Sequence, residues 1–577
     1  MRTPATLLTA VLLLSACGED KPTAARSGAP APGRTSTRSA EGPPQHPDEI
    51  RGEMSTATFD TDFDPAEAAK GGQIVLPLLD DVDSFNPYLA TSVSTSEVMD
   101  QLYLLPLKEH ADYHQGPPTF SALLVDRWRI EGTKLFAHLR DDAVWSDGTP
   151  ITSEDVRFSW EAARSTDVAW TSASIVDHIK DVEIVDAKNY VLHYDQAYPD
   201  MEMDSKDWRI LPKHVHGKVP FSEWKSYKDW DKLAAVVSGP YRVESYRHNE
   251  EFVLVPNEKF WDKDLPRLQK VYYRVLTDQQ TIFETLLAGG LDAQDSVLPK
   301  DAKRVLDHPD LYLYTFLSRG YGYLGWNCQH PIFKDPAVRR AMTLAIDRWN
   351  IVETLFYGYA KVTASPIISS MWACDRSIEP YPHDPEAARK LLLERGWKAG
   401  ADGILVKDGL RFEFSLATNA GNKVREQIAQ MVQADLKKIG VQANLSFQDF
   451  SSLGENLRKN KEDAWIAGWY VATKVDPKPT FHSSSFPDGY NYPAYSNPRV
   501  DELIDRGRVE RDRETALGIW HEFQAILHEE QPYTILYEAR ALNALRKRYH
   551  NVEMNALDVY FNLPEWFIPK SKLAATR

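Results

Sequence analysis

Two hydrophobic periodicities alternate along most of the chain. Apolar residues at every second position predict an opening strand over residues 71–76. Residues 424–439 have the apolar spacing of a long helix, which ends at Gly440 and passes into strand-like alternation over residues 441–447. Four further helix starts are predicted from capping signals at Thr152–Asp155, Thr277–Gln280, Asp335–Pro336 and Asp384–Pro385. This repeated change between strand and helix predicts an α/β fold, in which crevices between domains favour ligand sites.

The first residues of the chain have the pattern of an export signal. Arg2 supplies a positive charge, and the apolar run over residues 7–14 is shorter than the about 20 residues that span a bilayer. The run ends in Leu14-Ser15-Ala16-Cys17, which resembles a bacterial lipobox. That resemblance implies cleavage before Cys17 and acylation of its thiol and new amino group, which anchors a protein on a membrane. The alternative is an ordinary signal peptide with an unrelated cysteine.

The segment after Cys17 has the composition of a tether. Residues 18–55 contain six prolines and almost no large apolar side chains. Such a segment cannot bury enough surface to offset its ordering entropy. We therefore predict a flexible tether over residues 17–70 and a folded part that begins near Gly71. No apolar run after Gly71 approaches membrane-spanning length, so the folded part is predicted to be exported.

Composition narrows the function classes further. The 577 residues are 43% hydrophobic and 26% charged, which is typical of globular proteins. The formal net charge of -16 argues against nucleic acid as a partner, because binding phosphates needs a basic surface. Sequence motifs for zinc proteases, phosphate-binding loops, serine hydrolases and paired metal-binding cysteines are absent. We therefore expect no cofactor and no bound metal.

Histidine and cysteine offer few candidates for chemistry. The closest histidine pair, His214 and His216, is predicted to lie in a solvated loop. Cys328 and Cys374 are the cysteines of the folded part. In an exported protein they are a candidate disulfide, closing a loop of about 46 residues and worth about 2–4 kcal/mol. We predict this disulfide; the alternative is two separate buried thiols.

Aromatic residues are more informative about a site. They gather in three groups: Tyr321, Tyr323 and Trp326; Trp465, Trp469 and Tyr470; and Tyr490, Tyr492 and Tyr495. Each group alone is more often part of a core. Together they suit a cleft that holds a ligand between aromatic faces.

A series of short motifs then points to a known family. In chain order these are Gly71-Gly72, Asp83-Ser84-Phe85-Asn86-Pro87, Leu139-Arg140-Asp141, Trp145-Ser146-Asp147-Gly148-Thr149-Pro150-Ile151-Thr152, Glu154-Asp155-Val156, Leu211-Pro212-Lys213-His214, Gly239-Pro240-Tyr241, Phe260-Trp261, Gly290-Leu291-Asp292, Val338-Arg339-Arg340-Ala341, Ala345-Ile346-Asp347-Arg348, and Asp384-Pro385 through Gly396-Trp397. From about Gly71 to Leu563 the chain resembles the family 5 extracellular solute-binding proteins, the oligopeptide-, dipeptide- and nickel-binding receptors of bacterial ABC importers.

The resemblance implies a periplasmic-binding-protein-like fold of class II (cluster C). Two α/β lobes flank a cleft, two crossover segments join them, and an extra domain is inserted in the first lobe. The expected boundaries are a signal peptide over 1–16, the tether over 17–70, lobe I over 71–105, 200–305 and 535–577, the inserted domain over 106–199, and lobe II over 306–534. Ligand binding is expected to close the lobes.

The resemblance also implies the position of the ligand. The strand Ala464–Trp469 matches the family strand whose backbone lies beside the ligand. The expected ligand-binding residues are Ser92, Asn327, Ala467, Gly468, Trp469, Tyr470 and Tyr490. Peptide receptors of this family usually carry an aspartate three residues after the last tryptophan of that strand, where it pairs with the amino terminus of the peptide. Here that position is Ala472, so a peptide with a free amino terminus is not the expected ligand.

Several functions stay open at this level. The leading hypothesis is a substrate-binding lipoprotein of an ABC importer, held at the cell envelope through Cys17 and facing the periplasm or exterior. We expect a monomer without catalytic activity, with a membrane permease as its partner. The ligand alternatives are a peptide lacking a free amino terminus, a glycan, a metal chelate or another neutral solute. The functional alternatives are a ligand-sensing receptor of the same fold and an exported hydrolase.

Overall fold

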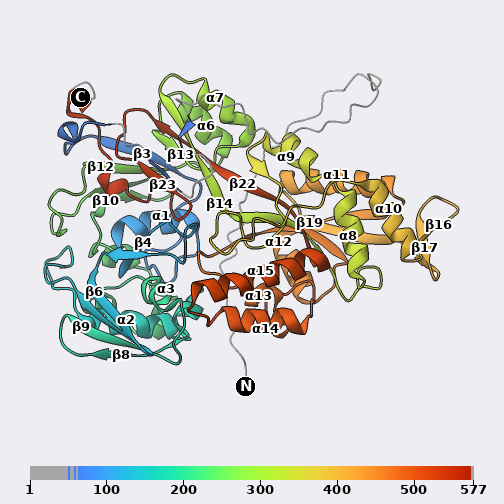
Figure 1. Cartoon of the computed structure of the whole chain (residues 1–577). Coiled ribbons are helices and arrows are strands. Elements are labelled where there is room, and N and C mark those ends of the chain that lie inside the picture. The colour runs from blue at the N-terminus through green and yellow to red at the C-terminus, as the bar shows by residue number, and fades with distance from the viewer. Residues whose placement is uncertain (1–49, 52–56, 60–62, 574–577) are drawn as a thin grey trace.

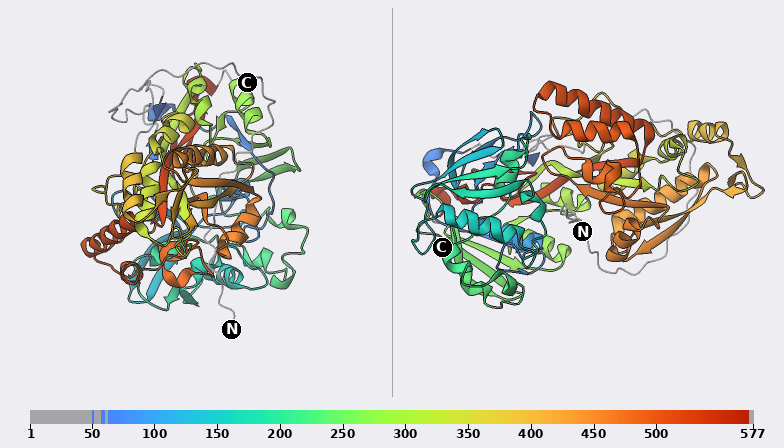
Figure 2. Two further views of the ribbon diagram at one scale, coloured as in Figure 1. Left: turned by 90° about the vertical axis from the view of Figure 1, so that its right-hand side faces the viewer. Right: turned by 90° about the horizontal axis from the view of Figure 1, so that it is seen from below.

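The computed structural model describes residues 50–51, 57–59 and 63–573, with side chains from residue 63 onward. The predicted signal peptide and Cys17 lie outside these residues. Figure 1 shows two lobes, one in blue and green and one in yellow, orange and red, joined by long strands. The right-hand view of Figure 2 shows the same two lobes from below. Within the described part of the chain, no helix is long and apolar enough to cross a membrane.

Lobe I contains a mixed sheet of four strands in the order β10-β11-β12-β3. Strands β3 and β12 pair in parallel and the other two pairs are antiparallel. The predicted opening strand is confirmed, with Ile74 and Leu76 fully buried. Around this sheet lie β4, α1, α3, α4, α5 and α6. The bounds of these elements are β3 Gln73–Leu78, β10 Tyr241–Arg247, β11 Glu251–Pro256, β12 Lys270–Val275, β4 Leu107–Glu109, α1 Val93–Leu102, α3 Met201–Lys206, α4 Lys213–His216, α5 Trp230–Leu233 and α6 Gln279–Leu287.

A second antiparallel sheet of four strands packs beside lobe I, in the order β6-β7-β9-β8. Helix α2 (Ser153–Arg164) covers it and begins with the predicted capping box. The Asp155 carboxylate accepts hydrogen bonds from the backbone N–H of Thr152, at 2.8 Å, and from that of Lys213. The strands are β6 Val125–Glu131, β7 Lys134–Leu139, β8 Ile179–Ile184 and β9 Asn189–Tyr194, and a small hairpin pairs β4 with β5 Phe120–Ala122.

Lobe II is built on a larger sheet whose main path is β13-β22-β14-β21-β19-β20. The predicted long helix is α11, which ends before Gly440 and leads into β20 as expected. Asp335 and Asp384 cap α8 and α10 as predicted. The lobe II elements are β19 Glu413–Asn419, β20 Gln442–Gln448, β21 Ala464–Tyr470, α8 Pro336–Ala345, α9 Arg348–Phe356, α10 Pro385–Glu394, α11 Lys423–Lys438, α12 Phe450–Arg458, α13 Lys478–Phe481, α14 Pro498–Gly507 and α15 Arg513–Glu530. Strand β13 (Ala293–Gln294) and helix α7 (Ala302–Leu306) lie with α6 and β3, at the end of the long strands that belongs to lobe I (Figure 1).

Two long strands connect the lobes. Strand β14 (Leu311–Trp326) and strand β22 (Tyr533–Arg546) pair antiparallel along most of their length, and both run from one lobe into the other in Figure 1. Strand β15 (Ala360–Lys361) adds to the same sheet at β22. The strands β16 Lys398–Ala399, β17 Leu405–Lys407 and β18 Leu410–Arg411 form a separate small antiparallel sheet. Because β21 pairs with β14, the predicted ligand strand lies at the junction between the lobes.

Folded structure begins earlier than Gly71, so the predicted tether is too long. Strand β1 (Ile50–Arg51) pairs in parallel with β14, and strand β2 (Ala57–Phe59) pairs antiparallel with β23 (Glu553–Asn555). The Glu67 carboxylate accepts hydrogen bonds from Ser571 in helix α16 (Lys570–Leu573). These partners come from distant parts of the chain, and backbone pairing needs no apolar side chains. Local composition therefore could not reveal them.

Three smaller predictions are corrected. Helix α6 is capped by Asp278 rather than Thr277, because the Asp278 carboxylate accepts from the backbone N–H of Thr281 at 2.6 Å. His216 lies in the short helix α4 rather than in a solvated loop. It is fully buried against the ring of Trp230, and burial lowers its pKa to about 3.

The predicted disulfide is also wrong, because Cys328 and Cys374 are free thiols. The Cys328 thiol donates to the carbonyl of Trp326 at the end of β14. Cys374 lies in the loop after β15, where its backbone N–H bonds to the carbonyl of Met371. The structure therefore agrees with the alternative prediction, two separate thiols.

Candidate ligand-binding site

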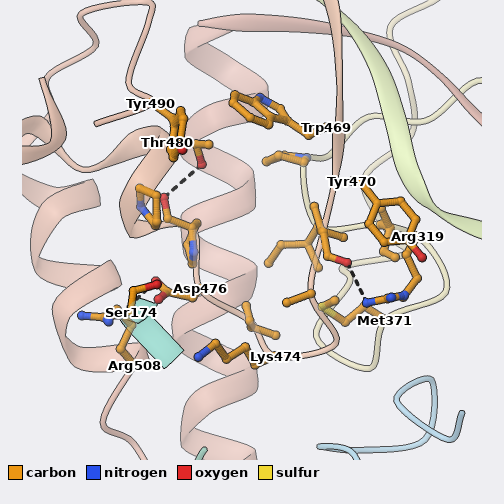
Figure 3. Close-up of a pocket in the computed structure, with 18 of the residues that line it drawn as sticks. Ser174, Arg319, Met371, Trp469, Tyr470, Lys474, Asp476, Thr480, Tyr490 and Arg508 are labelled. Atoms are coloured by element: carbon orange, nitrogen blue, oxygen red, sulfur yellow. Dashed lines mark hydrogen bonds and ion pairs between the residues drawn. The ribbon is translucent and has the colours of Figure 1, made fainter. Parts of the chain in front are cut away.

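A cavity of about 400 Å³ lies between the lobes. Lobe I contributes the segment before β8, which includes Ser174 and His178, together with Asp204 of α3. Lobe II contributes Arg319 of β14, the loop around Met371, and the chain from Trp469 to Phe481. Figure 3 shows these side chains around the cavity, with Trp469 and Tyr490 at one end and Lys474 at the other.

The aromatic end of the cavity is supported by the core of lobe II. The ring of Tyr490 meets that of Trp469 edge to face, at a centroid distance of 5.6 Å. Behind Trp469 lie Tyr323 and Tyr492, which are buried and do not line the cavity. The three aromatic groups of the sequence therefore divide into a core and a small exposed surface. That surface can stack against an apolar or aromatic part of a solute.

Arg319 forms one side of the cavity and links the two lobes. Its Nε donates to the carbonyl of Ala556 in lobe I at 2.8 Å, and its Nη1 donates to the carbonyl of Val471 at 3.1 Å. Its guanidinium also lies over the ring of Tyr470, whose hydroxyl donates to the same Ala556 carbonyl at 2.9 Å. These contacts fix the loop after β21 against lobe I.

Opposite charges are paired around the far end of the cavity. Lys474 Nζ lies 2.9 Å from an oxygen of Asp204, and Arg508 lies 2.9 Å from Asp476. Half-buried Asp200 faces the same group, and its pKa is raised to about 7. Burial is the main cause, the Asp204 and Asp476 carboxylates add to it, and Lys474 opposes it. Asp204 and Asp476, which line this end of the cavity, are thus each paired with a cation of the protein.

A second cavity of about 460 Å³ adjoins the first. It is lined by α1, by the segment around β4 and by the chain near Asp558, and it shares Arg319, Ala472 and Lys474 with the first cavity. The loop after β21 therefore separates two hollows between the lobes. Within residues 63–573, no group of three His, Cys, Asp or Glu side chains is placed to hold a metal ion.

The structure brings only part of the predicted ligand set to the cavity. Trp469, Tyr470 and Tyr490 line it. Ala467 and Gly468 lie in β21, where they pair with Tyr323 and Gly322 of β14, and they do not line the cavity.

Ser92 and Asn327 are also outside the cavity, and both have local structural contacts. Ser92 caps α1 by accepting from the backbone N–H of Thr95 at 3.1 Å. Asn327 is buried, donates to the carbonyl of Glu462 and accepts from the backbone N–H of Gln329. Serine and asparagine often have such capping roles, which the resemblance did not distinguish from ligand binding.

The charged residues of the cavity lie outside the motifs that predicted the ligand strand. Arg319 lies in the middle of an apolar strand, which is an unusual place for an arginine and was a usable signal. Lys474 follows the ligand strand by four residues. Its partner Asp204 is 270 residues away, so no local pattern connects them.

Comparison with known proteins decides the family. The sequence model described as "Bacterial extracellular solute-binding proteins, family 5 Middle" matches residues 85–492. The chain belongs to this family. Oligopeptide-binding protein AppA of Bacillus subtilis (strain 168) is 28% identical over 512 residues, which cover 87% of this chain and 92% of AppA. The dipeptide-binding protein of Escherichia coli (strain K12) is 21% identical over 493 residues, covering 81% of this chain and 89% of that protein.

Solved structures agree with this family assignment. Bacillus subtilis AppA in complex with a nonapeptide has a TM-score of 0.72 and 27% identity, covering 87% of this chain and all of AppA. The ABC transporter substrate-binding protein CtaP of Listeria monocytogenes has a TM-score of 0.75 and 23% identity, covering 86% and 99% of the two chains. The predicted α/β fold class with two lobes is confirmed. As a family 5 member the protein binds a solute, and the hydrolase alternative is not supported.

Proposed function

We propose that this protein captures a peptide-like or other small solute between its lobes and delivers it to an ABC permease. One relative is named an oligopeptide-binding protein, another a dipeptide-binding protein, and a protein of the same fold is an ABC transporter substrate-binding protein. The observation that carries the proposal is the interlobe cavity itself. It has the size of a small-molecule site, and its aromatic end is formed by the last residues of β21.

The expected mechanism is closure of a hinge. Strands β14 and β22 join the lobes, and a solute that contacts both lobes favours the arrangement in which they are close together. The permease then recognises the closed form. The protein holds the solute and does not convert it, so capture is stoichiometric.

We further infer that the solute has no free amino terminus. Ala472 presents a methyl group to the cavity at the position where the resemblance led us to expect an aspartate. A charged ammonium placed beside it loses its water and gains no carboxylate from this residue. An N-blocked peptide fits this end of the cavity better, and a glycan, a metal chelate or another neutral solute stays an alternative.

Native mass spectrometry of the purified protein tests the solute-binding proposal without assuming a ligand class. The expected result is one copy of a small molecule that leaves on unfolding. Adding it back to the refolded protein should raise the melting temperature, because a ligand that binds only the folded state stabilises it. Conversion of that molecule into a product during incubation would contradict the proposal.

The proposed envelope location rests on Cys17. We infer a monomer that is acylated at this cysteine and faces the periplasm or exterior. Replacing Cys17 with serine should move the protein from the membrane fraction to the soluble fraction and abolish labelling by a radioactive fatty acid. Continued lipid labelling of Cys17→Ser would exclude this anchor. Cys374→Ser, which removes a thiol of the folded part, is the matched control and should stay lipid-labelled.

A further inference from the structure

One charge pair of the cavity joins the two lobes. Lys474 extends from the loop after β21 in lobe II and meets Asp204 of α3 in lobe I, with 2.9 Å between Nζ and Oδ1. Asp204 is only 3% exposed, and its other oxygen accepts from the hydroxyl of Tyr198 at 2.6 Å. Both oxygens of this buried carboxylate therefore have partners, and one partner is an ammonium group.

Neighbouring contacts place Lys474 firmly. Thr473 donates to Glu109 of β4 at 2.5 Å, and the other oxygen of Glu109 lies 2.7 Å from Lys206 of α3. Two consecutive residues of the loop thus reach two carboxylates of lobe I. The Lys474 ammonium is fixed where both hollows between the lobes meet, since it lines both of them.

Three carboxylates lie around the Lys474 ammonium. Asp204 and Asp200 belong to lobe I, and Asp476 belongs to lobe II. Burial acts to lower the pKa of Lys474, but the Asp204 and Asp200 carboxylates outweigh it and hold that pKa above its usual value. Asp476 is paired separately with Arg508. At this end of the cavity the protein's own cations satisfy the carboxylates that a ligand ammonium would need.

We propose that Lys474 determines the specificity of the cleft by occupying, with its own ammonium, the position that a cationic amine of a solute would take beside Asp204. The inference rests on the proposed solute-binding function and deepens it. Solutes with a free amino group near this end are rejected, because two ammonium groups cannot share one buried carboxylate. Acylated or otherwise uncharged ends are accepted. Removing the Lys474 side chain should turn Asp204 into an amine site.

The test uses two probes, the tripeptide Ala-Phe-Ala and its N-acetyl derivative, with protein refolded from guanidinium to remove any solute carried through purification. Isothermal titration calorimetry measures binding to the wild type and to Lys474→Ala. The wild type should prefer the acetylated probe by about tenfold or more, since a buried charged group left without its partner costs at least that much. Lys474→Ala should bind the free-amine probe about tenfold more tightly than the wild type does, with no such gain for the acetylated probe.

Three further variants separate specificity from folding. Lys474→Arg keeps a cation and should show no gain. Lys474→Ala combined with Asp204→Asn removes the carboxylate and should lose the gain. Lys478→Ala removes the 2.7 Å pair between Lys478 and Asp505, outside both cavities, and should bind like the wild type.

Each outcome bears on the inference. Three results would overturn it. The wild type binds both probes equally well, or a folded Lys474→Ala binds the free-amine probe no more tightly than the wild type does, or no variant binds either probe. If Lys474→Ala does not fold, the preference of the wild type for the acetylated probe over the free-amine probe tests the inference by itself. Native mass spectrometry separates the failure of this inference from the failure of the proposed function. If it still detects a bound natural solute, the solute-binding function stands even when the role of Lys474 is contradicted.

Discussion

The indole ring of Trp469 lies parallel to the phenol ring of Tyr323, with 6.1 Å between the ring centroids and 7° between the ring planes. Tyr323 is buried and packs closely on Tyr533 of the other long strand. Trp469, in contrast, is half-buried and faces the cavity. The core of lobe II therefore orients the Trp469 ring at the cavity, and a preoriented ring loses little freedom when it binds a ligand.

Trp469→Ala should remove the solute-induced rise in melting temperature. Because Trp469 is half-buried, its loss should lower the free energy of unfolding by about 2 kcal/mol, less than removal of a fully buried tryptophan. Thermal unfolding with and without the solute found by mass spectrometry measures both quantities. Trp349→Ala, at a tryptophan that is 39% exposed and outside the cavity, is the control. An unchanged thermal shift in Trp469→Ala would exclude this ring from the site.

Lys206→Ala should destabilise the contact region between the lobes. Lys206 is buried and pairs with Glu109 and Asp207, and its removal leaves the buried Glu109 carboxylate with the Thr473 hydroxyl alone. Breaking a buried pair in this way costs about 3 kcal/mol. The midpoint of urea unfolding measures the loss. Lys232→Ala, which breaks an exposed pair with Asp229, should shift the midpoint far less, because solvent screens this pair. Equal effects of the two variants would contradict the burial argument.

Asp200→Asn should change how stability depends on pH. The pKa of Asp200 is raised to about 7 in the folded state, so the folded state favours the protonated carboxyl group. The free energy of unfolding therefore falls as pH rises from about 4 through 7, where the unfolded chain ionises more readily than the folded one. Asparagine cannot ionise, so the variant should gain stability over the wild type between pH 4 and pH 8, with little difference at pH 4. Urea unfolding across this range tests the sign. Asp167→Asn at an exposed position is the control.

A wild-type advantage over Asp200→Asn that grows with pH would contradict this assignment. Such a result would mean that the attraction of Lys474 for the Asp200 carboxylate exceeds the effect of burial. The charges that face Asp200 are those of Lys474, Asp204, Asp476 and Arg508.

Cys328 and Cys374 should react as two slow, separate thiols. Burial raises the pKa of Cys328 to about 11 and that of Cys374 to about 12, so few thiolates exist at pH 8. In the Cys17→Ser chain, iodoacetamide should modify neither thiol rapidly before unfolding and both after unfolding, without a reductant. Mass spectrometry counts the modified residues. Labelling that increases after reduction would show a disulfide and contradict the structure.

Much of the fold was readable from local sequence. Helices α8 and α10 begin at the predicted aspartate-proline pairs, and α11 ends at the predicted glycine. Such signals depend on residues within a few positions of one another, and neighbouring residues interact in any state of the chain. The start of α6 was predicted one residue too early, at Thr277, because the adjacent Asp278 is also a good capping residue and forms the cap in the structure.

The site was readable only in part. Trp469, Tyr470 and Tyr490 reach the cavity as expected, since their strand and loop carry a recognisable pattern. Ser92, Asn327, Ala467 and Gly468 lie outside the lining of this cavity, and ligand binding by the seven predicted residues stays a prediction.

Local sequence patterns were enough for the class of the protein: an α/β chain with the motifs of family 5 solute-binding proteins and an aromatic-rich strand at Ala464–Trp469. The folded structure was needed for the charge pairs of the cavity and for the pairing of β1 and β2 with distant strands. Lys474 meets Asp204 across 270 residues, and Thr473 meets Glu109 across 364. Local periodicity carries no information about such pairs, because their residues are hundreds of positions apart and become neighbours only in the folded chain.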